Sequence, residues 1–264
     1  MNSLHIVKIG GQVIDQEENL IRFLKVLVSA DKKFILVHGG GKTATNLAGQ
    51  MGLSQCLVQG RRVTDAATLK IACMVYAGLI NKQIVARLQA LGIDALGLSG
   101  ADLNCIRTVK REAGEIDYGY VGDLIPEGVD AGKFNFLLKG GFTPVVCAIT
   151  HDGKGQLLNT NADTLASELA IALSGQYEVH LHYCFEKKGV LQDAEDENSA
   201  ITGLDSSLYD ALRQKGVISK GMIPKLDNAF KARHNGVGKV RIGHSDSIKQ
   251  MILQTNFHGT ELIE

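Results

Sequence analysis

The sequence lacks the features that would assign it to several specialised classes of protein. Its charge is balanced, with 28 Lys and Arg residues against 28 Asp and Glu residues, and it has no acidic tail. The chain thus has no basic excess that would indicate nucleic-acid binding. The chain also has no apolar run of roughly 18 residues and no signal-peptide pattern at its beginning. We therefore expect a cytoplasmic protein with neither nucleic acid nor membrane as a partner.

Cysteine and proline are also scarce. The five cysteines are scattered singly without a CxxC pair, which is typical of reduced thiols in a cytoplasmic protein. With 3 prolines and 30 glycines, the chain makes its turns with glycine. The remaining composition, 45% hydrophobic and 21% charged residues over 264 positions, is ordinary for a globular protein. A chain of this length can form one large domain or two small ones around a substantial core.

The first fifty residues follow the pattern of an α/β fold. Short apolar runs at 5–9 and 34–38 predict strands, and helical periodicity predicts helices over 17–30 and 42–51. The run at 34–38 is continuous, as in a strand buried on both faces of a parallel sheet. By the same criteria we expect later hairpins at 54–64 and at 106–109 with 118–121, and strands at 93–98, 143–147, 178–184, 237–243 and 261–263. Thr64-Asp65 can cap a helix that runs through 69–75. Further helices are expected at 79–90, 131–138, 164–173, 206–214 and 222–235.

Each of the first two predicted strands ends in glycines. Lys8 closes the first strand before Gly10-Gly11, and the second strand runs into the triple glycine at 39–41. The carboxyl ends of parallel strands lie at one edge of a sheet, so the two turns should face each other. Glycine turns leave backbone N–H groups uncovered for anions. Two such turns and a lysine favour a ligand with several negative charges, such as a nucleoside triphosphate. The alternative is an ordinary strand-to-helix turn with a snorkelling lysine.

Two specific nucleotide-binding motifs do not fit the triple glycine. Leu36 stands where the Walker A motif requires its first glycine. The segment can be aligned with GxGxxA through Ala44, but Gln59, not an acidic residue, lies near the position that binds ribose in dinucleotide-binding folds. The general interpretation, an anion-binding turn that opens a helix, is therefore the safer one.

Three later polar segments have both a structural and a functional interpretation. The segment Asn-Thr-Asn-Ala-Asp at 159–163 precedes a helix and can cap it. Lys225 stands in a first helical turn, where the positive helix end disfavours a cation, and this indicates a separate role such as meeting a phosphate. Arg61 and Arg62 in the first hairpin can bind a carboxylate bidentately or be solvated surface charges.

The histidines give no comparable signal. His180 and His182 share one face of a predicted strand. Without a carboxylate or cysteine partner at metal-ligand spacing, two histidines are more often core or surface residues than metal ligands. We find no defensible Ser/His/Asp or Cys/His grouping for nucleophilic catalysis in the sequence.

Six motifs in this order resemble the amino acid kinase superfamily and, within it, the N-acetylglutamate kinase family of arginine biosynthesis. They are KIGG (8–11), VHGGGK (37–42), GRRVT (60–64), GLSGAD (97–102), NTNAD (159–163) and KGMIPK (220–225). The resemblance implies a three-layer α-β-α sandwich with a central, mainly parallel sheet. It also implies two lobes: residues 1–175 bind the acylglutamate and dimerise, and residues 176–264 bind ATP.

The resemblance further implies a role for each motif residue. Lys8 and Lys225 stabilise the transferring phosphoryl group, and Asp163 holds both lysines. The remaining implied residues are Gly10, Gly11 and Gly40 for the phosphoryl oxygens, and Gly40, Gly41, Arg62 and Asn159 for the acylglutamate. Mg²⁺ comes with ATP and rests on phosphate oxygens, so no metal-ligating residue is expected.

The implied reaction is ATP-dependent phosphorylation of the γ-carboxylate of an N-acyl-L-glutamate, N-acetyl or N-succinyl. A carboxylate is ionised at neutral pH, so the reaction needs positioning and charge stabilisation but no general base. The hairpin at 54–64 could close over the site as a lid. The alternatives are another phosphotransferase of the superfamily, a non-catalytic nucleotide-binding regulator and, more remotely, an NAD(P) dehydrogenase.

Three departures from the family pattern leave details open. Phe185 and Glu186 stand where relatives have a small hydroxyl residue and an aspartate, which puts the ATP-side contacts in doubt. Lys8 lies too close to Met1 for the extra N-terminal helix of arginine-sensitive relatives, so we expect an arginine-insensitive homodimer. A second hairpin carries Arg107, Lys110 and Arg111, which are either solvated charges or a binding site for the extra carboxylate of a succinyl group.

Overall fold

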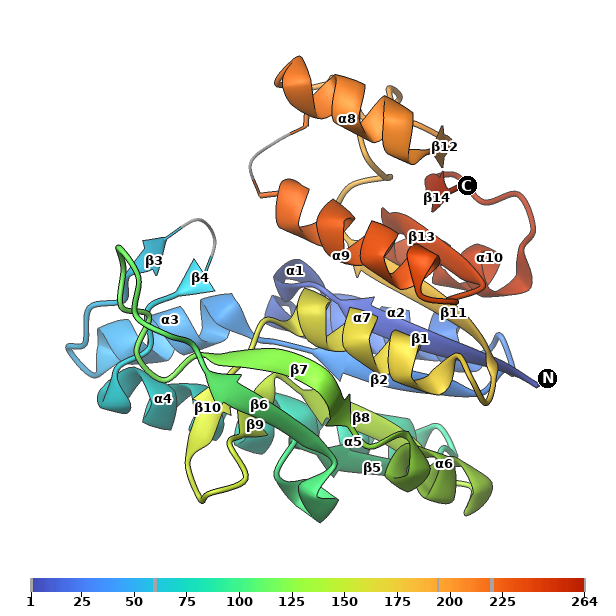
Figure 1. The fold of residues 1–264 in the computed structure, drawn as a ribbon. Coiled ribbons are helices and arrows are strands. Elements are labelled where there is room, and N and C mark those ends of the chain that lie inside the picture. Colours follow the sequence, from blue (N-terminus) through green and yellow to red (C-terminus); the bar gives the residue numbers. More distant parts are fainter. Residues whose placement is uncertain (1, 59–60, 194, 219–220, 264) are drawn as a thin grey trace.

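The computed structural model describes residues 2–58, 61–193, 195–218 and 221–263, and it is built around one eight-stranded sheet (Figure 1). All neighbouring strands run parallel except β13 and β14, so the sheet is mainly parallel as predicted. In spatial order the strands are β12 (Gly203–Leu204), β14 (Thr260–Leu262), β13 (Lys239–His244), β11 (Glu178–Phe185), β1 (Ser3–Ile9), β2 (Phe34–His38), β8 (Thr143–Cys147) and β5 (Ala95–Leu98).

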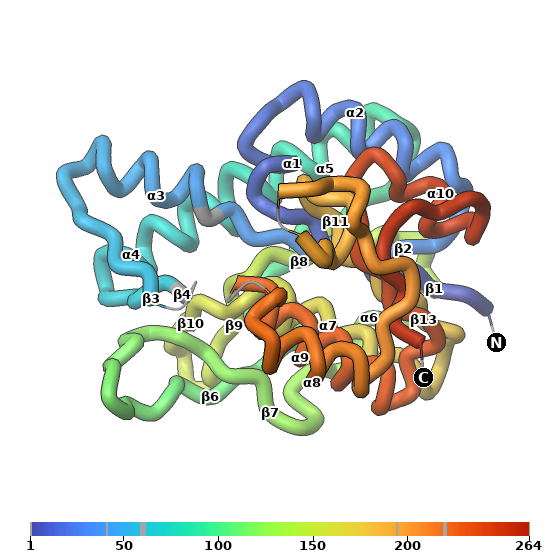
Figure 2. The backbone as a smooth tube through the Cα atoms, turned by 90° about the horizontal axis from the view of Figure 1, so that it is seen from above, coloured from blue at the N-terminus to red at the C-terminus, as the bar shows by residue number. Residues whose placement is uncertain are grey.

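Helices cover both faces of this sheet, which confirms the three-layer expectation (Figure 2). Every residue of β2 is buried, because its continuous apolar run contacts a helical layer on each side. One layer consists of α1 (Gly11–Asp15), α2 (Glu17–Val28), α5 (Asn81–Ala90) and α10 (Ile248–Leu253); the other consists of α6 (Ala131–Lys139), α7 (Ala162–Leu173) and α9 (Ile223–His234), with α8 (Ser206–Gln214) outside α9.

The side chains of β1 divide between the two cores. Leu4 and Ile6 belong to the core beneath α7, and Val7 and Ile9 belong to the core beneath α2. This alternation follows from the two-residue period of a strand. Consequently Lys8 lies on the α7 face of the sheet.

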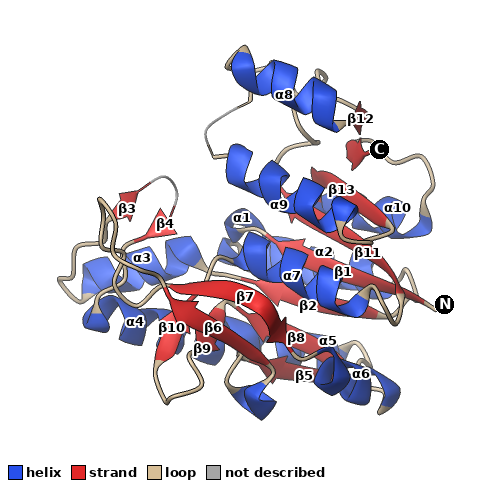
Figure 3. Ribbon diagram, in the orientation of Figure 1, coloured by secondary structure: helices blue, strands red, loops and turns tan. Residues whose placement is uncertain are grey.

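A smaller four-stranded sheet stands beside the carboxyl ends of the main sheet (Figure 3). Its strands are β10 (Leu157–Asn159), β9 (Ile149–His151), β6 (Ile106–Lys110) and β7 (Gly122–Val129). The prediction that 118–121 forms the second strand of the hairpin is wrong. The backbone of Tyr118 and Tyr120 bonds to Thr64 instead, and β6 pairs with β7. The β6–β7 hairpin is also not confined to the surface, because Ile106 and Val129 pack into the core.

The hairpin predicted at 54–64 is present as β3 (Leu57–Val58) and β4 (Arg61–Arg62), while its turn lies outside the described residues. Helix α3 (Gly41–Gln50) leads into it. After it, Asp65 caps α4 (Ala66–Ala72) by accepting a bond from the Thr68 N–H, at 2.7 Å. This cap was predicted from the sequence.

Helices α4 and α5 are joined through a π-helical turn at Cys73–Ile80. The resulting stretch, Ala66–Ala90, is long and apolar enough to cross a membrane by length and composition alone, with a mean hydropathy of 1.3 over its most apolar window. Because 44% of that window is buried within the protein, a core helix explains it equally well. Short 3₁₀ turns at Asp102–Asn104 and Ser245–Ser247 complete the secondary structure of the described residues.

Candidate active site

The structure brings Lys8, Asp163 and Lys225 together from three different elements. Lys8 Nζ lies 2.7 Å from Asp163 Oδ1, and Lys225 Nζ lies 2.8 Å from Asp163 Oδ2. The three side chains are only 12–18% exposed. One carboxylate therefore fixes the positions of two ammonium groups and leaves the group with a net charge of about one positive unit.

Local structure explains why Asp163 is available for this task. Asn161 is the N-cap of α7, and its side chain accepts bonds from the Asp163 and Thr164 N–H groups at 2.9 and 3.0 Å. The Asp163 carboxylate, released from capping, stands in the first helical turn, where the helix dipole favours a negative charge. The alternative of pure capping therefore applies to Asn161 and not to Asp163.

Lys225 occupies the first turn of α9, as the sequence predicts. Three contacts offset the unfavourable interaction of its charge with the positive end of the helix. Asp163 supplies the counter-charge, and the rings of Tyr183 and Phe185 have their centroids 5.1 and 5.8 Å from Lys225 Nζ. Asn228 Nδ2, one turn along α9, donates to Thr164 Oγ1 of α7 at 3.1 Å. The aromatic Phe185, which departs from the family pattern, thus packs against a lysine of the site.

The charges of the cluster shift the pKa values of its members. Burial raises the pKa of Asp163, but the ammonium groups of Lys225 and Lys8 outweigh burial and hold that pKa well below its usual range. Burial lowers the pKa of Lys225, as does Lys8, and the charge of Asp163 opposes the change. Asp163 is therefore an anion throughout the physiological range, and its low pKa makes it a poor general base.

The two glycine turns face each other across a cavity of about 360 Å³ at the carboxyl ends of β1 and β2. Gly11, Gly39 and Gly40 line it together with Lys8 and Asp163. The N–H of Gly10 instead donates to the Cys184 carbonyl at 3.0 Å. The structure thus commits the Gly10 N–H to the sheet, and the N–H groups left to meet a phosphoryl group are those of Gly11 and Gly40.

Any residue with a side chain would be strained at position 40. Its φ of +154° lies in a region that side chains avoid, and an added Cβ would stand 2.2 Å from Ile80 Cδ1. Ile80 and the nearby Tyr76 both lie in the π-helical turn. That turn therefore shapes the floor of the cavity beside the second glycine turn, consistent with the frequent occurrence of π-turns at functional sites.

Sequence reasoning missed two positioning residues, His38 and Asn81. His38 is buried, its Nδ1 bonds to the Gly39 carbonyl at 2.8 Å, and Asn81 Nδ2 lies 3.1 Å from His38 Nε2. Burial lowers the pKa of His38 to about 4, so the ring is neutral and can accept from Asn81 while donating to Gly39. The only signal in the sequence was the place of His38 directly before the triple glycine.

Arg62 and Asn159 form another part of the cavity wall. Arg62 donates to Gln55 and, at 2.8 Å, to Thr45 Oγ1. Asn159 Nδ2 donates to Thr64 Oγ1 at 3.0 Å. Thr64 Oγ1 in turn donates to the Arg62 carbonyl at 2.9 Å. Two of the predicted substrate-binding residues, Arg62 and Asn159, therefore share one network that ties the β3–β4 hairpin to β10. Gly41 opens α3 next to this wall.

Of the three basic residues in the second hairpin, only Arg111 lines the cavity. Arg107 and Lys110 are exposed. Arg111 forms a bidentate ion pair with Asp123, which also lines the cavity. The hydrogen bond to Asp123 raises the pKa of Arg111, so this cation is permanent but already paired.

A second, smaller cavity of about 100 Å³ lies in the C-terminal part of the chain. Its walls are mainly apolar, with Val190, Leu191, Val217, Ile218 and Met222 around Lys187. Met222 is the N-cap residue of α9, which carries Lys225. Asn228 of α9 lines the larger cavity. Both cavities therefore touch the helix that carries Lys225, although Lys225 is a lining residue of neither.

The chain is similar to known proteins over its whole length. It matches the Amino acid kinase family over residues 3–244, a range that contains all six motifs. It is 50% identical to the acetylglutamate kinase of Cytophaga hutchinsonii over 264 residues, 100% of this chain and 99% of that protein. It is 49% identical to the acetylglutamate kinase of Bacteroides thetaiotaomicron over 246 residues, 93% of this chain and 95% of the relative. Among solved structures, smu.665 of Streptococcus mutans matches with a TM-score of 0.79 at 25% identity, covering 98% of each chain.

Proposed function

The chain belongs to the amino acid kinase family, and from that premise we propose that it is an acetylglutamate kinase. It transfers the γ-phosphoryl group of ATP to the γ-carboxylate of N-acetyl-L-glutamate, a step of arginine biosynthesis. The observation that carries this proposal is Asp163 held between Lys8 and Lys225 beside two glycine turns, in a chain about half identical to acetylglutamate kinases. Another kinase of the superfamily or a non-catalytic regulator is not favoured.

The mechanism follows from charge. The attacking carboxylate needs no base, so the site has only to align two anions and to stabilise the charge on the transferring phosphoryl group. Lys8 lines the glycine-walled cavity and Lys225 lies on the nucleotide side, so we assign them to the phosphoryl oxygens and the leaving oxygen. Asp163 positions both, and the N–H groups of Gly11 and Gly40 complete the clamp.

ATP enters the reaction as its Mg²⁺ complex. The two lysines and glycine turns fit the phosphate chain, and the apolar cavity around Val190 and Met222 fits a nucleoside base. Lys8, Lys225 and the glycine turns would hold the phosphate chain, and bound Mg²⁺ would supply further positive charge to it. In this proposal the acylglutamate binds to the lobe formed by residues 1–175, and ATP binds to the lobe formed by residues 176–264.

The arrangement of subunits and the compartment are part of the same proposal. We place the homodimer interface within residues 1–175, on the helix that carries the exposed apolar residues Met74 and Leu79, which are 51% and 48% exposed. A cytoplasmic location is supported by five cysteines that are all free thiols.

One observation favours a second candidate substrate, N-succinyl-L-glutamate. Arg111 lines the cavity and could receive the extra carboxylate if its pair with Asp123 opened. Comparing kcat/KM for the two acylglutamates decides between them. If succinylglutamate is the substrate, Arg111→Met lowers kcat/KM for it by at least about tenfold, which is the effect of losing a charged hydrogen bond, and leaves acetylglutamate unaffected.

The activity itself is tested by measuring ADP release. We expect release that depends on N-acetyl-L-glutamate and is lost in Lys8→Ala and in Lys225→Ala. A protein that binds ATP and phosphorylates neither acylglutamate would be a regulator, and the proposed function would then be wrong.

A further inference from the structure

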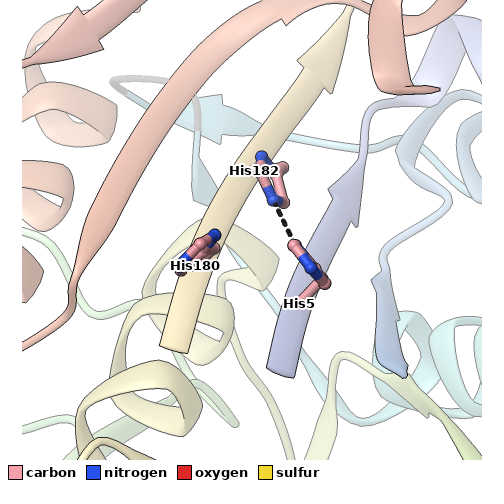
Figure 4. A group of neighbouring side chains, drawn as sticks. All are labelled: His5, His180 and His182. Atoms are coloured by element: carbon pink, nitrogen blue, oxygen red, sulfur yellow. Dashed lines mark hydrogen bonds between the residues drawn. The ribbon is translucent and has the colours of Figure 1, made fainter. Parts of the chain in front are cut away.

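Three buried histidines meet between β1 and β11, away from the active site (Figure 4). His5 and His180 are direct neighbours in the parallel register, and His182 follows on the same face of β11. All three are at most 2% exposed, and one ring nitrogen from each lies within 4.8 Å of the others. His5 is three residues before Lys8, about 10 Å along the strand, and its side chain lies on the opposite face of the sheet.

The hydrogen bonds of the cluster leave buried nitrogens without partners. His5 Nδ1 lies 3.0 Å from His182 Nε2. His180 Nε2 lies 3.4 Å from Glu178 Oε1, while His180 Nδ1 and His182 Nδ1 are buried without a partner among the described residues. A buried polar atom without a partner calls for an explanation, because most such atoms are satisfied.

Glu178 supplies part of that explanation. When the Nε2–H of His180 donates to this carboxylate, the lone pair of His180 is on Nδ1, the atom that has no partner. A carboxylate that orients a histidine through its second nitrogen is the usual outer contact of a metal-binding histidine. The sequence pattern showed only two histidines without a carboxylate at ligand spacing, and the fold supplies both the third histidine and the orienting acid.

The three histidines are also in the protonation state that metal ligands require. Burial lowers the pKa of His5 to about 3 and lowers the pKa of His182 well below its usual value. A neutral imidazole keeps one lone pair for a cation. If both His5 Nδ1 and His182 Nε2 bind the ion, the proton between them moves to the other ring nitrogen of its own histidine. The nearest buried cation, Arg241 on β13, is offset by Glu261 at 2.7 Å.

We propose that His5, His180 and His182 form a binding site for a first-row divalent transition-metal ion, with Zn²⁺ as the best fit. Imidazole nitrogens suit Zn²⁺, whereas Mg²⁺ and Ca²⁺ require oxygen ligands. Zn–N bonds of about 2.1 Å in a tetrahedron separate two nitrogens by about 3.4 Å. His5 Nδ1 and His182 Nε2, at 3.0 Å, need to move apart by only a few tenths of an ångström. A water molecule takes the fourth position.

The role of this site is structural. The ion would link β1, the first strand of the N-terminal lobe, to β11, the first strand of the C-terminal lobe. His182 lies beside Val7, one residue before Lys8, but on the face of the sheet opposite to Lys8. The ion would therefore brace the sheet on which the catalytic lysine stands. The inference does not depend on the proposed kinase activity.

The test uses the full chain without a polyhistidine tag, stripped of metal with a chelator. We expect Co²⁺ to produce the visible absorption of a tetrahedral site, and Zn²⁺ at 100 times its Kd to raise Tm by roughly 5–10 °C. His182→Asn should abolish both effects. The control His258→Gln removes an exposed histidine outside the cluster and should leave both effects intact.

Glu178→Ala keeps the test decisive if His182→Asn does not fold. The Glu178 side chain is 59% exposed, so its loss should leave the fold intact and weaken Zn²⁺ binding about 10- to 100-fold, as removal of an outer-shell partner does. A wild-type chain with no Co²⁺ spectrum and no Zn²⁺-dependent rise in Tm would overturn the proposal. Unchanged Zn²⁺ affinity in Glu178→Ala would overturn it as well, since the ion would then bind elsewhere.

Discussion

Replacing Asp163 with asparagine removes one charge and almost no volume. In the wild type this carboxylate lies 2.7 Å from Lys8 Nζ and 2.8 Å from Lys225 Nζ. The variant would leave two ammonium groups, each in a side chain only 12% exposed, facing a neutral amide. Removal of one partner from a buried pair costs about 3 kcal/mol or more, and in a domain of this size that lowers Tm by roughly 6–12 °C.

The same variant should lose catalysis because both lysines lose their common anchor. We expect kcat to fall by at least about 100-fold, the usual effect of removing one group that stabilises transition-state charge. KM for N-acetylglutamate should change much less, because Arg62 and Asn159, the cavity residues that we assign to the acylglutamate, are unchanged in this variant. Steady-state kinetics with ADP detection measures both quantities.

A matched control lies on the same pair of helices. Glu168 of α7 pairs with Lys231 of α9, but Lys231 is 55% exposed. Glu168→Gln should therefore cost at most about 1 kcal/mol and leave kcat unchanged. If Asp163→Asn kept kcat within threefold of wild type, the reasoning about the two lysines would be refuted.

The pH dependence of the unfolding free energy provides a second test of the role of Asp163. The pKa of Asp163 is depressed in the folded protein, so its contribution is present above the unfolded pKa of about 3.9 and is lost as pH falls further. The difference in unfolding free energy between wild type and Asp163→Asn should be constant above about pH 5 and shrink below about pH 4. A constant difference down to pH 2 would contradict the assignment.

Further predictions concern the glycine turn, the first lysine and the arginine. Gly40→Ala should destabilise the fold and weaken acylglutamate binding, because its Cβ would stand 2.2 Å from Ile80 Cδ1. Gly49→Ala, with open space around it, should instead stabilise α3 by about 0.5–1 kcal/mol in thermal unfolding. Equal Tm values for the two variants would contradict this prediction. Lys8→Arg should lower kcat more than it changes KM, because the wider guanidinium misplaces the charge, and an unchanged kcat would return Lys8 to a structural role. Arg62→Lys should raise KM for the acylglutamate about tenfold through loss of bidentate binding, with kcat nearly constant; an unchanged KM would remove Arg62 from the substrate site.

Local patterns predicted most of the elements and where they begin. The apolar run at 34–38, the helical periodicity at 17–30 and the Asp65 cap all reappear, because strand burial, amphipathicity and capping each depend on a few neighbouring residues. The hairpin strand expected at 118–121 failed for the opposite reason. Its backbone groups bond to Thr64 and Asn159, residues distant in sequence, and no local propensity encodes that choice.

The candidate site divides in the same way. The sequence by itself determined which residues are chemically suited to it: a lysine before a glycine turn, an acid behind an asparagine cap and a lysine in a first helical turn. Only the tertiary structure decided that Asp163 contacts both lysines, that the Gly10 N–H is committed to Cys184, and that His5 meets two histidines of β11. These outcomes depend on which strands lie side by side, and strand order is set by packing of the whole chain.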